Sequence, residues 1–408
     1  MQEQELIPHL FRTEFSKITA VLCKLFGVEN VNIAEDIAAE TYLSALETWP
    51  YKGVPENPTA WLYTVAKNKA KNLISRNQVF RHKITPVIES LSPTMYEPEI
   101  DLSAKNIADS QLQMLFTVCH PSIPVESQIG LALRILCGFG ITEIANAFLT
   151  NKETINKRLL RAKEKLRAQM SVVEFPQENE LNNRLQSVLT TLYLLFNEGY
   201  YSESEDTVLR KDFCLEAMRL TYMLIDNELT NHPDVNALLA LMCFQASRFE
   251  ARKDANGETV LYDDQDESLW NQQLITKGAY YLSRASRGNR LSKYHLEANI
   301  AYWYTIKEDT KEKWENVLQL FNQLLMIGYS PIVALNRTYA LSKVKGNEAA
   351  IIEAEKLNLI TNHFYFTLLG ELYKGIDKEK AKANLLKALQ LSKTITDKQI
   401  IQNKIDRL

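Results

Sequence analysis

The amino-acid sequence predicts an all-α protein with several domains. Its 408 residues exceed what one core normally holds, and at roughly 100–200 residues per domain we expect two to four. Gly (13) and Pro (12) are sparse, whereas the helix-favouring residues Leu, Ala, Glu and Lys are abundant. Hydrophobic content of 46% and charged content of 24% are globular values. We expect two small helical domains joined by a linker, the second a helix-turn-helix, and a C-terminal helical-repeat domain.

Apolar residues recur at helical spacing through residues 5–48. Gly27 is expected to end a first helix, and Asn32 to cap a second one that runs from about Ile33 to Thr48. Residues 49–58 predict a loop, because three prolines and a glycine interrupt them. Residues 59–76 predict a further helix.

Segments without periodicity divide the chain. Residues 84–108 contain prolines and acidic side chains, which predicts an acidic linker between domains at 1–83 and 109–172. A second boundary at 171–180 precedes a helical domain at 178–408. Near its end, two consecutive stretches each contain a pair of helices, which favours tetratricopeptide-like repeats of about 34 residues. Gly370 and Tyr373 fit the usual positions of such a repeat, whereas its Trp and final Pro are missing.

The net charge of −3 does not by itself indicate a nucleic-acid partner. Residues 1–170 carry 19 basic and 18 acidic side chains, and the remaining residues carry 28 basic and 32 acidic ones. Neither part is strongly basic overall, so a nucleic-acid site is expected only where basic residues cluster. The five cysteines form no CxxC pair and are odd in number, which predicts reduced, mostly buried thiols. The first residues do not resemble a signal peptide and no apolar stretch has a membrane span's length, so we expect a cytoplasmic protein.

Two short helices and a tight turn between residues 142 and 167 predict a helix-turn-helix. The second helix carries seven basic and two acidic residues beside one apolar stripe, which consists of Ile155, Leu159, Ala162 and Leu166. Asn151 is placed to cap this helix, and Ala145 in the preceding one allows close packing. The basic side chains would neutralise phosphates while residues near the helix start face base edges. The alternative is a solvated surface helix.

A second basic segment, residues 60–83, has six Lys and Arg residues and no acidic one. Trp61, Tyr63 and Phe80 lie among them, and basic groups beside aromatic rings suit unpaired DNA, whose bases stack on the rings. The alternative is that Trp61 belongs to the core. Residues 34–49 predict an acidic amphipathic helix, and such a helix in a DNA-binding protein indicates a protein partner for its acidic face. An ordinary surface helix is the alternative here.

The order and spacing of these elements resemble bacterial RNA polymerase sigma factors of the extracytoplasmic-function group. "AEDIAAETYLSALETW" is similar to their core-binding helix in region 2, and "AWLYTVAKNKAKNLISR" to the helix that melts the promoter and reads the −10 element. "EIANAFLTNKETINKRLLRAKEKLR" resembles region 4, which reads the −35 element. The resemblance covers roughly residues 8–170. "CHPSIPVESQIGLALRILCGF" and "LYLLFNEGYY" resemble a subgroup with a large C-terminal tetratricopeptide-like domain.

The resemblance implies roles for particular residues and partners. The residues implied to bind core polymerase are Glu35, Asp36, Glu40 and Tyr42. Those implied to bind the −10 element are Trp61, Lys67, Asn68, Lys69, Lys71, Asn72 and Arg76. Those implied to bind the −35 element are Lys152, Glu153, Thr154, Asn156, Lys157, Arg158 and Arg161. The resemblance implies core RNA polymerase and promoter DNA as partners, an intramolecular or protein partner for the C-terminal domain, no membrane, and no catalytic residue, metal or cofactor.

Three positions depart from the family's pattern. Ala39 replaces a polar residue of the core-binding helix, so that core affinity would depend more on Asp36 and Glu40. Leu149 stands where a turn glycine is usual, so either the turn differs or the alignment is shifted by one residue. Asn156 stands where Lys is frequent, which would alter the −35 sequence that is read.

Two other classes of protein compete with the sigma-factor interpretation. A helix-turn-helix regulator with a helical sensor domain, acting without replacing sigma, explains residues 140–170 but not the acidic helix, the basic helix and the linker. An enzyme is disfavoured, because the six histidines are scattered and the chain has no HExxH, P-loop or GxGxxG motif. The adjacent Cys119 and His120 are interpreted as local packing.

Overall fold

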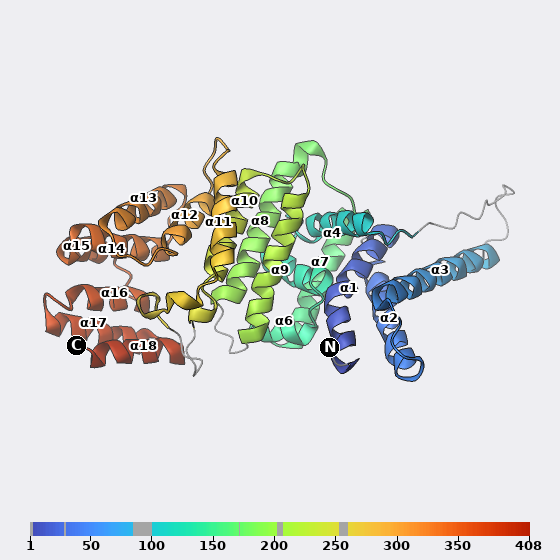
Figure 1. Ribbon diagram of the computed structural model, residues 1–408, viewed down its shortest axis with the longest axis horizontal. Coiled ribbons are helices and arrows are strands. Elements are labelled where there is room, and N and C mark those ends of the chain that lie inside the picture. The colour runs from blue at the N-terminus through green and yellow to red at the C-terminus, as the bar shows by residue number, and fades with distance from the viewer. Residues whose placement is uncertain (1–2, 28–29, 85–99, 171, 202–206, 253–259) are drawn as a thin grey trace. The chain divides into compact units, whose positions relative to one another are not determined.

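The structure is a computed structural model that describes residues 3–27, 30–84, 100–170, 172–201, 207–252 and 260–408 (Figure 1). These residues form α-helices with short 3₁₀ and π-helical turns and no strand, which confirms the all-α prediction. The predicted linker falls largely outside the described residues. Among the helices that are described, none is long and apolar enough to span a bilayer.

The chain divides into two compact units, residues 1–224 and 225–408. Helix α8 (Glu178–Tyr201) and most of α9 (Thr207–Asp226) therefore belong to the first unit. Both had been expected in the C-terminal domain. The four-part division drawn from the sequence stays a prediction.

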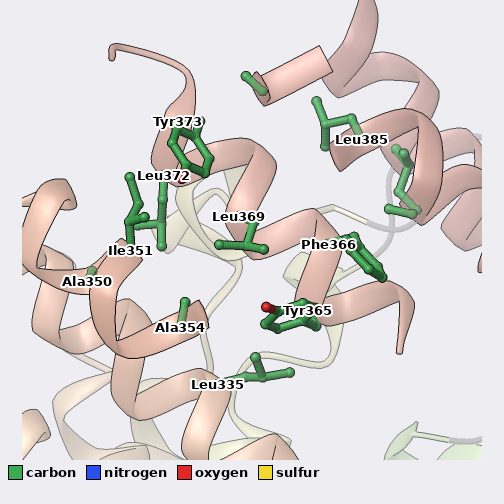
Figure 2. Packing of buried hydrophobic residues seen from close by; sticks show 13 residues of the cluster. Leu335, Ala350, Ile351, Ala354, Tyr365, Phe366, Leu369, Leu372, Tyr373 and Leu385 are labelled. Atoms are coloured by element: carbon green, nitrogen blue, oxygen red, sulfur yellow. The ribbon is translucent and has the colours of Figure 1, made fainter. Parts of the chain in front are cut away.

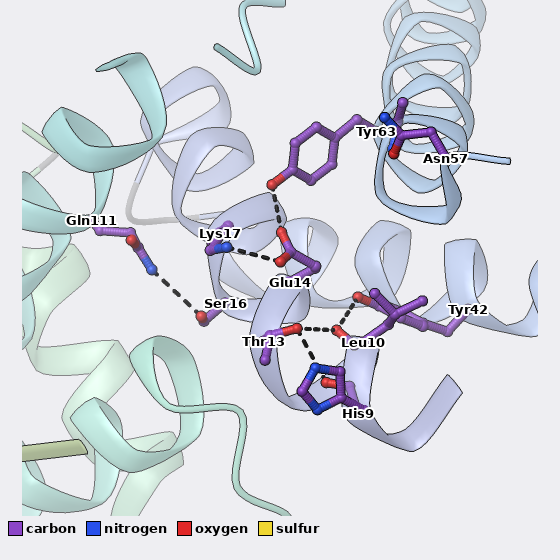
Figure 3. Close-up of polar contacts among 11 residues, drawn as sticks. His9, Leu10, Thr13, Glu14, Ser16, Lys17, Tyr42, Asn57, Tyr63 and Gln111 are labelled. Atoms are coloured by element: carbon purple, nitrogen blue, oxygen red, sulfur yellow. Dashed lines mark hydrogen bonds and ion pairs between the residues drawn. The ribbon is translucent and has the colours of Figure 1, made fainter. Parts of the chain in front are cut away.

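Helix α1 (Glu3–Phe26) is the hub of the first unit. It packs against α2 (Val31–Lys52), α3 (Pro58–Ile84) and α4 (Ala104–Val118). Figure 3 shows one hydrogen bond to each: Tyr42 Oη to Leu10 O (2.8 Å), Tyr63 Oη to Glu14 Oε2 (2.5 Å) and Gln111 Nε2 to Ser16 Oγ (3.4 Å). Burial and the bond to Glu14 raise the pKa of the Tyr63 phenol, so that it remains a donor at neutral pH.

The prediction that α2 starts near Ile33 and ends at Thr48 was wrong at both ends. Asn32 lies inside the helix, and Asn30 occupies the capping position without a side-chain cap bond. The helix continues through Pro50 and ends at Gly53, whose φ of 82° suits glycine. Packing explains the extension: buried Trp49 lies edge-on to Trp61 of α3, with ring centroids 5.4 Å apart.

The remaining helices of the first unit are α5 (Val125–Leu131), α6 (Ile141–Ala147) and α7 (Lys152–Gln169). Between α5 and α6 the backbone widens into a π-helical turn, Ala132–Leu136. Its signature is the i→i+5 hydrogen bond from Cys137 N to Ala132 O (3.1 Å). This turn directs Arg134 towards α2, where it takes part in the site described below.

The second unit is a series of helices in which each packs against its neighbours in sequence. They are α10 (Pro233–Ala246), α11 (Gln272–Ala285), α12 (Lys293–Trp303), α13 (Lys311–Ile327), α14 (Pro331–Lys345), α15 (Asn347–Leu357), α16 (His363–Tyr373), α17 (Lys378–Leu391) and α18 (Ile395–Asp406). The two predicted helix pairs are present as α14–α15 and α16–α17, and their buried apolar side chains form one core (Figure 2). Sequential packing of this kind is typical of helical repeats.

Gly370 permits the close approach of α16 and α17. A Cβ atom added there would lie 2.6 Å from Leu385 Cγ, well inside van der Waals contact. We expect Gly370→Ala to destabilise this helix pair by about 1–3 kcal/mol, because the added methyl group overpacks the contact. The higher helix propensity of alanine offsets a smaller part of this loss. Faster amide exchange of residues 363–391 in the full chain would measure the effect.

Gly375→Ala is the matched control, because nothing lies within 4 Å of its added Cβ. It should change stability by less than about 0.5 kcal/mol. Equal protection in both variants would show that the helices readjust at no cost.

Candidate nucleic-acid interface

One face of α2 combines exposed acidic and exposed apolar side chains. We call this face the docking stripe; it consists of Asp36, Glu40, Leu43, Leu46 and Glu47. Leu43 is 55% and Leu46 52% exposed, although apolar side chains of an amphipathic helix are usually buried. Exposed leucines between carboxylates provide apolar contact area together with charge, as interaction surfaces commonly do.

Tyr42 does not lie on this stripe. Its side chain is 3% exposed in the contact between α1 and α2. Its hydroxyl donates a hydrogen bond to the Leu10 carbonyl oxygen, because a buried hydroxyl needs a partner. Burial also raises the pKa of this phenol. Tyr42 therefore stabilises the helix pair, and its predicted direct contact with polymerase is not available in this conformation.

Glu35 is also buried, at 8% exposure, and its carboxylate binds two cations from distant parts of the chain. Arg134 Nε lies 3.0 Å from Glu35 Oε1, and Lys163 Nζ of α7 lies 2.6 Å from Glu35 Oε2. Lys163 Nζ also donates to Asn32 Oδ1 at 2.9 Å. The sequence placed Glu35 with the exposed acidic residues, but in the structure Asp36 and Glu40 are exposed and Glu35 is not.

Basic and amide side chains lie along α3, the second predicted element. Asn68, Asn72 and Arg76 are exposed, and Lys67, Lys69 and Lys71 are half-buried. Lys69 Nζ lies 3.3 Å from Glu40 Oε2, and this partly exposed surface ion pair should contribute at most about 1 kcal/mol. Trp61 is half-buried against Trp49, so that both interpretations of its ring, core packing and base contact, retain support.

Helices α6 and α7 form the predicted helix-turn-helix. The Asn151 side chain accepts a hydrogen bond from Thr154 N at 2.8 Å, which confirms the predicted cap. The predicted apolar stripe of α7 is buried, as is Ala145. The exposed predicted −35 residues are Lys152, Glu153, Thr154, Asn156, Lys157 and Arg161. Arg158 is half-buried, with its guanidinium 5.9 Å from the centre of the Phe148 ring.

The turn between α6 and α7 holds Leu149 at φ 49°, the left-handed conformation that favours glycine. Leu149 is 68% exposed, so little packing compensates for the strain. We expect Leu149→Gly to stabilise the protein by about 1 kcal/mol, because a left-handed conformation costs a leucine roughly that much. Urea denaturation of the full chain measures the change.

Leu160→Gly serves as the control, because Leu160 is exposed in the middle of α7. Glycine in a helix interior should destabilise by about 1 kcal/mol, so the two leucine-to-glycine changes should differ in sign. The same sign for both would show that the turn does not strain Leu149.

Two residues of the site had no assigned role in the sequence interpretation, Arg134 and Lys163. Lys163 is one of the seven basic residues of its helix, and no local pattern distinguishes it from Lys165. A weak signal exists in helical periodicity, because Lys163 follows Asn156 by seven residues and so lies on the same flank of α7.

The five cysteines are all buried and unbonded to each other, which confirms the prediction. Burial raises the pKa of the Cys119 thiol to about 12, so its nucleophilic thiolate is not populated at neutral pH. The neighbouring His120 imidazole lies 2.7 Å from Ser122 Oγ, within its own loop. Both observations support local packing at this pair.

Comparison with known proteins supports the N-terminal assignment. Residues 10–79, which include most of α1, all of α2 and most of α3, match the sigma-70 region 2 family. A region 2 domain implies binding to core RNA polymerase. Residues 184–286 match a family of unknown function (DUF6596). No solved structure matches the chain significantly.

A relative extends over nearly the whole chain. An uncharacterized protein of Rhizobium meliloti is 33% identical over 387 residues, which cover 93% of this chain and 90% of the relative. The chain therefore belongs to the family of that Rhizobium meliloti protein, as a helical protein with a sigma-70 region 2 domain near its N-terminus and a DUF6596 region further on.

Proposed function

We propose that this protein is a non-enzymatic sigma factor of the extracytoplasmic-function group, which binds core RNA polymerase and directs promoter recognition, melting and transcription initiation. The observation that carries the proposal is the region 2 match over residues 10–79. This region contains both the exposed docking stripe of α2 and the basic α3. A helix that binds protein beside a helix that binds DNA is what initiation at a promoter requires.

In this proposal the docking stripe binds polymerase and α3 binds the −10 element. Lys67, Lys69, Lys71 and Arg76 would hold the DNA backbone, while Asn68 and Asn72 contact bases or sugars. A flipped base would be captured near residues 50–60, with Trp61 at its side, at an unstacking cost of about a few kcal/mol.

Helix α7 would set the register by entering the major groove of the −35 element. The capped start of α7 and its exposed Lys152, Asn156, Lys157 and Arg161 support this role. Arg158 and the first-turn residues Glu153 and Thr154 would contribute from the same end of the helix. The C-terminal unit is proposed to regulate initiation or to bind a partner, in place of a separate anti-sigma factor.

The test is a pull-down of purified core RNA polymerase by the full-length chain, followed by run-off transcription from genomic fragments. A sigma factor should be retained by the polymerase and should produce promoter-specific transcripts. Retention of duplex DNA without polymerase binding would instead favour the helix-turn-helix regulator with a helical sensor domain. Neither polymerase nor DNA binding would contradict both proposals.

A further inference from the structure

We propose that the Glu35 carboxylate acts as an internal substitute for a DNA phosphate. By binding Lys163 of α7, it would hold the chain in a closed state that must open before region 4 can engage a promoter. This inference rests on the proposed function, since it assigns a regulatory contact to the same DNA-binding helix. It starts from the two ion pairs of Glu35 on α2, one with Arg134 of the π-helical turn and one with Lys163 of α7.

The geometry around Glu35 resembles that of a bound oxyanion. Each carboxylate oxygen receives one cation, Arg134 at 3.0 Å and Lys163 at 2.6 Å. Arg134 is held in place by a second hydrogen bond, from Nη1 to the Phe139 carbonyl oxygen at 3.3 Å, and by the Phe15 ring 6.0 Å away. Such a carboxylate is fully engaged, and removing one partner leaves an uncompensated charge in a buried place.

Lys163 lies on a flank of α7 that also carries residues proposed to contact DNA. Helical rotation of 100° per residue places it on the same flank as Lys152, eleven residues earlier, and Asn156, seven residues earlier. Those two side chains are exposed, whereas the Lys163 side chain is 12% exposed beneath Asn32 and Glu35. The first turn of α2 therefore occupies the space beside Lys163 and adds a negative charge there.

A closed state of this kind cannot be the promoter-bound state. The −10 and −35 elements are about 25 base pairs apart, roughly 85 Å at 3.4 Å per base pair. In the structure α2, which precedes the −10 helix, touches α7 directly, with Asn32 Oδ1 and Lys163 Nζ 2.9 Å apart. Separation of the two DNA-binding elements must therefore break the contacts of Glu35, and Lys163 would exchange this carboxylate for phosphate.

The experiment measures how salt weakens binding of the full chain to a mixed-sequence duplex of about 30 base pairs, a length that offers several phosphate contacts. Glu35→Gln should bind the duplex about 5–10-fold more tightly at moderate salt, within the range of ordinary coupling between sites. Because Lys163 becomes available for one phosphate, the plot of log K against log salt should steepen by about 0.9. In Glu35→Gln/Lys163→Gln, this extra slope should disappear.

Glu164→Gln is the matched control, because it removes the same charge from an exposed position on α7 itself. Loss of a surface charge alone should change affinity by less than about threefold and leave the slope unchanged, because no phosphate contact is added. An effect of Glu35→Gln no larger than that of Glu164→Gln would overturn the proposal. A slope that stays steep in the double variant would overturn it as well.

A second variant covers the case in which Glu35→Gln fails to fold. Lys163→Gln also opens the closed state but leaves the Glu35–Arg134 pair intact, and in the free chain it should speed amide exchange in the first turns of α2. Lys165→Gln, an exposed neighbour, should not. Equal protection in Lys163→Gln and wild type would contradict the closed state. These readouts need no polymerase, so a failed pull-down would reject the sigma-factor proposal without deciding this one.

Discussion

A fragment that ends at residue 224 is expected to fold and unfold cooperatively, whereas one that ends at residue 175 should lose stable structure. The compact unit extends to residue 224 because α8 packs against α4 and α5. Three side chains on one face of α8 make hydrogen bonds to these segments: Arg184 Nη2 to Phe116 O (2.7 Å), Ser187 Oγ to Cys119 O (2.7 Å) and Thr191 Oγ1 to Gln128 Oε1 (2.5 Å). Val188, on the same face, is fully buried.

The size of the loss follows from these contacts. Each buried acceptor left without its donor costs about 1–3 kcal/mol, and each large apolar side chain returned to water about 1.5–3 kcal/mol. The sum approaches the roughly 5–15 kcal/mol by which a domain is stable. Helix α9 adds an ion pair between Asp212 and Arg12, and a hydrogen bond from Arg219 Nη2 to Leu136 O at 2.8 Å.

Thermal unfolding followed by circular dichroism separates the two fragments, with the full-length chain as the reference. Residues 1–224 should show one cooperative transition, and residues 1–175 a broad or absent one. A cooperative transition at the same temperature in both would show that α8 and α9 are dispensable for folding. Functional comparison of the N-terminal part with the full chain should therefore use the longer fragment.

Aspartate at both exposed leucines of the docking stripe should abolish polymerase binding without unfolding the chain. Leu43 and Leu46 are more than half exposed, so the fold should tolerate Leu43→Asp/Leu46→Asp within about 0.5 kcal/mol. An apolar contact at the centre of an interface contributes about 2 kcal/mol, or roughly 30-fold in affinity, and two such contacts contribute correspondingly more. The variant should be lost from the polymerase pull-down and should give no run-off transcript.

Leu386→Asp provides the control for this variant. Leu386 is 43% exposed on α17 in the second unit, so it presents the same side chain on a helix far along the chain from the stripe. Wild-type polymerase affinity is expected for Leu386→Asp. If the stripe variant kept wild-type affinity with an unchanged melting temperature, polymerase docking through this face of α2 would be rejected.

The local elements could be predicted from sequence because their signals lie within a few residues. The cap at Asn151 and the buried stripe of α7 each depend on neighbours along the chain. At Leu149 the residue type and the backbone conformation disagree. The turn keeps the left-handed backbone conformation that the flanking helices require, although the residue there is not glycine.

The boundary of α2 was less predictable because proline and glycine signals conflict with packing. Pro50 suggested that the helix had ended, but burial of Trp49 against Trp61 extends it to Lys52. The assignment of α8 and α9 to the first unit has the same origin. No composition change marks residue 224, and the contacts of Arg184 and Ser187 with α4 and its C-terminal end join segments 68 residues apart.

By itself, the sequence determined that the protein is helical and that its basic clusters lie on α3 and α7, although α3 continues to Ile84 rather than ending at residue 76. Helical periodicity is a local property, and it suffices for those conclusions. Only the tertiary structure decided which acidic residue of α2 remains exposed and which is buried. Glu35 and Asp36 are adjacent, yet Glu35 is buried because Arg134 and Lys163, 99 and 128 residues away in sequence, bring the charges that its burial requires.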